Sequence, residues 1–72
     1  MSSHWHYQLM KHTTPDGEVY YAVHEYYELE TGPAFTHNPV TIDGESVAEV
    51  VQMLNNISVD ILKHGVKDYD TD

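Results

Sequence analysis

The sequence contains no cysteine, and it has only three basic residues against twelve acidic ones in a chain of 72 residues. Without cysteine, no disulfide can form, and the composition fits a reducing cytosol better than a secreted scaffold. No basic-plus-apolar leader stands at the N-terminus, and no apolar stretch approaches the roughly 20 residues of a membrane-spanning helix. We therefore expect a cytoplasmic protein that has no membrane partner.

The formal net charge is −9, and it excludes one large class of partners. Such a chain is repelled by phosphate backbones, and it gains no counterion-release free energy on contact with them. We expect no binding to nucleic acid. A protein with a basic surface is the charged partner that this composition would tolerate.

Motifs for catalysis are also missing. The sequence has no nucleophile elbow, no phosphate-binding loop and no dinucleotide-binding glycine pattern. Glu25, Glu28 and Glu30 with His24 could form an acid–base cluster, but so small a chain has little room for a deep pocket. We predict that the protein is not an enzyme and uses no cofactor.

The alternation of side chains predicts a β-hairpin at the start of the chain. Residues 4–13 alternate with a period of two, and a second strand rich in Val and Tyr covers about 18–27. The turn Thr14-Pro15-Asp16-Gly17 fixes the register, because Pro15 has no N–H to donate to a ladder. Thr14 then faces Glu18, so that paired residue numbers sum to 32. A third extended segment covers 34–42, where Pro39 favours an edge strand.

One helix is predicted from about residue 47 to 64. Ser46 is a good N-cap, Glu49 completes a capping box, and Gly65 suits the left-handed residue that ends a helix. The predicted fold is α+β with the order β-β-β-α, a three-stranded antiparallel sheet with the C-terminal helix packed on one face. Residues 1–66 form the single domain, and 67–72 form an acidic frayed tail.

The hairpin register divides the side chains between two faces, which we call the odd face and the even face after their residue numbers. The odd face carries Trp5, Tyr7, Leu9, Val19, Tyr21, Val23 and Tyr27 and is the more apolar, so we expect the helix to cover it. The predicted core comprises Trp5, Tyr7, Leu9, Val23, Phe35, Val50, Leu54, Ile57 and Ile61.

The even face is then left uncovered, because one helix covers only one face of a sheet. Its Tyr and Met side chains are typical of protein interfaces. With an exposed edge strand, it predicts a non-enzymatic protein-interaction module that forms a homodimer or binds a basic protein. The predicted interaction face consists of Met10, His12, Tyr20, Ala22, His24 and Tyr26.

The six histidines offer an alternative function, a small metal- or ligand-binding protein. His4 and His6 share one face, and the register places His24 diagonally across from His6, with Glu28 on the same face. These side chains are strung along a sheet, and no metal-binding spacing supports them. We therefore predict no metal, with His4, His6 and His24 as the residues to examine.

Two segments carry a resemblance to known proteins. Tyr20-Tyr-Ala-Val-His-Glu-Tyr-Tyr27 and Pro39-Val-Thr-Ile-Asp-Gly-Glu-Ser46 resemble a family of small uncharacterised bacterial and phage proteins. The resemblance implies a bacterial or phage protein, acting in the host cytoplasm if phage-encoded, and no activity. The strand order and the helix entry at residues 44–49 are also remotely similar to the HicB antitoxin domain, which would imply a toxin protein as partner.

Overall fold

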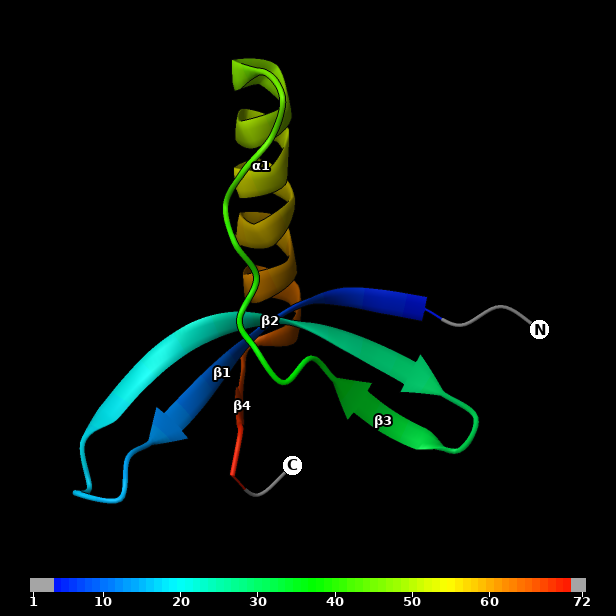
Figure 1. Cartoon of the computed structure of the whole chain (residues 1–72). Helices are drawn as coiled ribbons and strands as arrows, with labels where there is room; N and C mark the ends of the chain where they lie inside the picture. Colours follow the sequence, from blue (N-terminus) through cyan, green and yellow to red (C-terminus); the bar gives the residue numbers. More distant parts are fainter. Residues whose placement is uncertain (1–3, 71–72) are drawn as a thin grey trace.

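The computed structural model describes residues 4–70, which form one helix and a four-stranded mixed sheet (Figure 1). Strands β1 (His4–Thr13), β2 (Val19–Leu29) and β3 (Gly32–Phe35) precede helix α1 (Val47–His64), and β4 (Val66–Asp68) follows it. The strand order is β3-β2-β1-β4. The α+β class is confirmed, and β1, β2 and β3 pair antiparallel as predicted. The prediction lacked the fourth strand, β4, which runs parallel to β1 and makes the sheet mixed.

The hairpin forms in the predicted register. Every β1–β2 partner pair sums to 32, from His4 opposite Glu28 to Thr13 opposite Val19. Gly17 has a φ of 90°, a left-handed conformation that glycine adopts without strain, and its N–H donates to the carbonyl of Thr14. The third extended segment forms a regular strand only over Gly32–Phe35, although the N–H of Val40 still donates to the carbonyl of Val23.

The sheet curls around its even face, and this face is the buried one. His6, Gln8, Met10, His12, His24 and Tyr26 are all buried, whereas Trp5 on the odd face is 52% exposed. The outer strand β3 and the segment after β4 approach each other across this face, where the rings of Phe35 and Tyr69 lie 5.3 Å apart. The predicted assignment of the two faces is therefore wrong: the curl of the sheet covers most of the even face, and α1 adds only the ring of His64, which stacks on His6.

Helix α1 has the predicted bounds but not the predicted packing. The Ser46 hydroxyl accepts a hydrogen bond from the N–H of Glu49 at 3.2 Å, and the Glu49 carboxylate accepts one from the N–H of Glu45 at 2.9 Å. In Figure 1 the helix stands away from the sheet, which lies at its C-terminal end. An Asp60 carboxylate oxygen accepts a hydrogen bond from the N–H of Tyr7 at 2.9 Å and ties this end to β1.

The predicted core is consequently wrong for most of its members. Of those nine residues only Ile57 is buried, while Trp5 and Leu54 are half exposed and the other six are half-buried. Met10 and Tyr26, which were placed on the interaction face, are the other buried apolar side chains of the described residues.

The predicted frayed tail is also wrong for residues 67–70. Residues Val66–Asp68 pair with Leu9–Lys11 as β4, and the N–H of Tyr69 donates to the carbonyl of Lys11 at 2.9 Å. Gly65 ends the helix with a φ of 71°, and its carbonyl accepts a hydrogen bond from the buried amide of Gln8 at 2.8 Å. The last part of the predicted tail, 71–72, lies outside the described residues.

The overall shape is extended for so short a chain. The radius of gyration is 13.3 Å, whereas a compact domain of this length has about 11 Å. The accessible surface is 5243 Å², whereas a folded monomer of this mass exposes about 4,600 Å². Most side chains of the standing helix are exposed. Among residues 4–70, no helix combines the length and apolarity needed to cross a membrane.

Candidate interaction surface and histidine cluster

The predicted interaction face lies mostly inside the fold. Met10 and His24 have no exposed surface, and His12 and Tyr26 are 8% exposed. Only Tyr20, at 50%, is exposed, and Ala22 is half-buried. The prediction that these six residues present an uncovered surface is therefore corrected: four of them form the interior of the curled sheet.

Two of these residues form a hydrogen-bonded histidine pair. Nε2 of His12 and Nε2 of His24 lie 2.8 Å apart, and Nδ1 of His24 lies 2.8 Å from the carbonyl oxygen of Thr36. Because a carbonyl only accepts, His24 carries its proton on Nδ1, and its Nε2 accepts from His12 when both rings are neutral. If both Nε2 atoms carried a proton, this hydrogen bond could not form.

Aromatic rings enclose this pair. The ring of His12 is stacked between Tyr20, at 4.8 Å, and Tyr69, at 4.2 Å. His24 lies 5.3 Å from Tyr69 and 6.4 Å from Phe35. The two histidines thus serve as flat rings of the core, with both nitrogens of His24 and Nε2 of His12 in hydrogen bonds.

Burial lowers the pKa of His24, and the nearby His12 and His37 lower it further against the opposing effect of the Thr36 hydrogen bond. Burial also lowers the pKa of His64, followed in effect by His6 and Lys63. The unfolded chain therefore binds more protons below about pH 6.5, the ordinary histidine pKa. We expect the free energy of unfolding to fall as the pH drops below that value.

Urea denaturation at about pH 7.5 and about pH 5 measures this loss. His24→Asn keeps a donor for the Thr36 carbonyl, and it should lose less stability between the two pH values than wild type does. The control His4→Gln, at an exposed position, should lose as much stability as wild type. A wild-type stability that is equal at both pH values, or that rises on acidification, contradicts the sign derived from the His24 pKa.

The metal candidates do not converge. The described residues contain no group of three or more His, Asp or Glu side chains arranged to hold a metal ion. His4 is exposed at the start of β1, and both nitrogens of His24 are occupied by Thr36 and His12. Nε2 of His6 pairs with the Gln8 side-chain oxygen at 2.9 Å.

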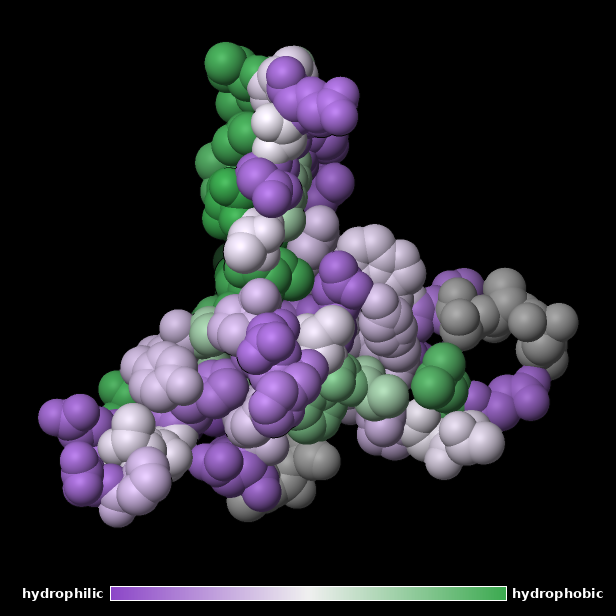
Figure 2. All heavy atoms as spheres, in the orientation of Figure 1, coloured by the Kyte–Doolittle hydropathy of each residue, from purple (hydrophilic) through white to green (hydrophobic). Residues whose placement is uncertain are grey.

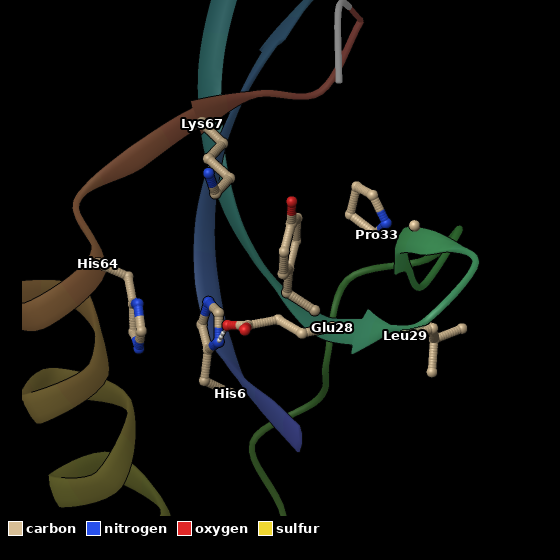
Figure 3. Close-up of a pocket in the computed structure, with 8 residues that line it drawn as sticks. His6, Glu28, Leu29, Pro33, His64 and Lys67 are labelled. Atoms are coloured by element: carbon tan, nitrogen blue, oxygen red, sulfur yellow. Dashed lines mark ion pairs between the residues drawn. The ribbon is translucent and has the colours of Figure 1, made fainter. Parts of the chain in front are cut away.

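An open pocket of about 320 Å³ lies between the C-terminal end of α1 and the β2–β3 turn (Figure 3). The His6 ring stacks on His64 at 3.5 Å and forms a 3.7 Å ion pair with Glu28 when charged. The Lys67 ammonium lies 5.3 Å from the centre of the Tyr26 ring, a cation–π contact. The lining is completed by Leu29, Gly32 and Pro33.

This pocket has polar groups but no reactive centre. Stacked imidazoles direct their nitrogens side by side rather than toward one point, so His6 and His64 do not form a common ion site. No Ser, Thr or Cys lines the pocket as a nucleophile. The Glu28 carboxylate already faces His6, and the Lys67 ammonium already contacts the Tyr26 ring.

An uncovered apolar surface runs along α1. Figure 2 shows hydrophobic atoms along one side of the helix and hydrophilic atoms on the other. Val47 is 81% and Leu62 86% exposed, and Val51 and Leu54 are 48% exposed. We call the row formed by Val47, Val51, Leu54, Ser58 and Ile61 the α1 stripe.

The spacing of the α1 stripe is that of a coiled-coil seam. Its members are separated alternately by four and three positions, as the a and d positions of a heptad are. The positions beside the seam carry no Asp, Glu or Lys. Sequence reasoning assigned Leu54 and Ile61 of this row to the core, because apolar spacing on a helix does not tell a face packed on a sheet from one left exposed. The flanking residues are Ala48, Val50, Asn55, Ile57, Leu62 and His64.

Comparison with known protein families, with curated proteins and with solved structures returned no match. The resemblance to small bacterial and phage proteins, and the remote one to HicB, therefore stay predictions.

Proposed function

We propose that this protein is a non-enzymatic protein-interaction module whose contact surface is the α1 stripe. The observation that carries the proposal is the exposure of this stripe: Val47 is 81% exposed, and Val51 and Leu54 are each 48% exposed. Soluble monomers rarely leave a contiguous apolar surface of this kind uncovered, and such surfaces mark binding sites for other proteins. The even face, at first the expected contact surface, is not proposed again because it is buried.

The need for stability supports the same proposal. The buried apolar side chains of the described residues are Met10, Tyr26 and Ile57. Chains of this length without disulfides gain much of their stability from a metal or from a partner. A partner that covers the α1 stripe would supply the missing apolar contacts.

A small ligand-binding function is the weaker candidate. Its site would be the pocket between His6 and Lys67, and the polar groups there already have partners within the chain. On the α1 stripe, Val47, Val51 and Leu54 stay exposed in the described chain. Because the polar groups of the pocket are already paired and the α1 stripe is exposed, protein binding is favoured over small-ligand binding.

Site-specific photocrosslinking in the expressing cell tests the proposal. A photoreactive amino acid replaces Val51, on the α1 stripe, and in a matched variant it replaces Gln52, on the polar side of the same helix. We expect a covalent adduct with protein from position 51 and little from position 52. Equal labelling at both positions, or none at either, contradicts the proposed contact surface.

A further inference from the structure

We propose that the occupant of the α1 stripe is a second copy of this chain, whose α1 packs antiparallel to the first. The inference rests on the proposed function and names its partner. It is carried by three observations: the pattern of the stripe, the excess surface of the chain, and the charges at the two ends of α1.

The pattern of the α1 stripe is self-complementary. A two-fold dimer brings the same surface of both copies together, so each side chain must tolerate itself or its neighbours as contacts. Val51, Leu54 and Ile61 can interdigitate with their own counterparts, as seam residues of paired helices do. The neutral flanking positions place no like charges beside the seam, which matters for two chains of net charge −9 each.

The excess surface has the size that one such interface requires. The chain exposes 5243 Å², about 600–700 Å² more than a compact monomer of its mass. A stable protein–protein interface covers about 800 Å² on each partner. Pairing of α1 with a second α1, together with contacts at the exposed ends Val47 and Leu62, would remove an area of this order.

The charges at the ends of α1 decide its orientation. Acidic Asp43, Glu45 and Glu49 surround the N-terminal end, and basic Lys63 lies in the last turn. A parallel pair would bring the acidic ends of both copies together, where like charges repel. An antiparallel pair sets each acidic end beside the partner's basic end. It also places the two helix dipoles antiparallel, which is the favourable arrangement.

A cysteine exchange experiment tests the partner and the orientation together, since the natural chain has no cysteine. The single variants Val47→Cys and Leu62→Cys, both at highly exposed positions, are mixed under reducing conditions and then joined by a short bis-maleimide. The two chains differ in mass, so mass spectrometry separates the mixed 47–62 product from the two like products. We expect the mixed product in at least about tenfold excess, because crosslinking requires close approach of the two sulfurs.

Each other outcome overturns the proposal. A majority of 47–47 and 62–62 products would show parallel pairing. Absence of crosslinked chains, while the photocrosslinker at position 51 still captures a different protein, would exclude the second copy and leave the proposed function standing. Replacing Gln52 by Cys in the mixture controls for random collision, and its products should stay at background.

Discussion

Met10→Ala should lower the free energy of unfolding by about 2–5 kcal/mol, as large-to-small changes at buried positions do. Met10 has no exposed surface and lies on the even face opposite Ala22, inside the curl of the sheet. A domain with so few buried apolar side chains has little stability to lose, so much of the population would unfold at room temperature. Urea denaturation followed by circular dichroism measures the change.

Leu54→Ala is the matched comparison, because the sequence alone predicts that Leu54 belongs to the core. In the structure Leu54 is 48% exposed, so its truncation should cost clearly less than that of Met10 when the chain is dilute and monomeric. The reverse order, with Leu54→Ala the more damaging change in dilute solution, would show that the helix packs on the sheet and that the described burial of the even face is wrong.

Leu54→Glu should abolish self-association while leaving the fold of the single chain intact. The substitution places one carboxylate from each copy at the middle of the α1 stripe, and burying an unpaired charge in an apolar contact is strongly unfavourable. We expect the dimer to weaken by at least about 100-fold, which corresponds to roughly 2.7 kcal/mol. Analytical ultracentrifugation of the variant over a range of concentrations measures the dissociation constant.

Gln52→Glu controls for the added negative charge. Gln52 lies on the polar side of α1, where its amide donates to the Asn56 side chain at 3.0 Å. This variant should associate as wild type does, within a few-fold. If both variants dissociate equally, the net charge and not the α1 stripe governs association; if Leu54→Glu stays dimeric, the interface lies elsewhere on the chain.

Local chemistry made the hairpin and the helix predictable. Pro15 excluded the two-residue turn and so fixed the register of β1 and β2 for all their partner pairs. Ser46 and Gly65 marked the two ends of α1, which runs over Val47–His64 as predicted. These features depend on residues near one another in the chain, where backbone geometry and capping decide.

The choice between the two sheet faces depended on longer-range contacts. The odd face is the more apolar by composition, yet the even face is buried because Phe35 and Tyr69 close over it from opposite edges of the sheet. A histidine pair made this possible: His12 and His24 share a hydrogen bond between their Nε2 atoms and stack as aromatic rings. Counting imidazoles as polar, solvent-facing groups led the sequence-based assignment to the wrong face.

Strand β4 was also beyond local reasoning. It has only three residues, Val66–Asp68, and the last two of them were interpreted as the start of an acidic tail. It pairs parallel with Leu9–Lys11 because α1 ends beside β1 and the chain then continues along that strand. The hydrogen bond from the Gln8 amide to the Gly65 carbonyl holds the chain at that point.

The mass of the wild-type protein in solution tests the central claim most directly, that the apolar side of α1 is a contact surface for a second copy. Sedimentation equilibrium at about 100 μM chain and neutral pH should give twice the mass of one chain, which corresponds to an association at least in the micromolar range. Dilution should return the mass of a single chain. A single-chain mass at every concentration up to about 100 μM would contradict the account.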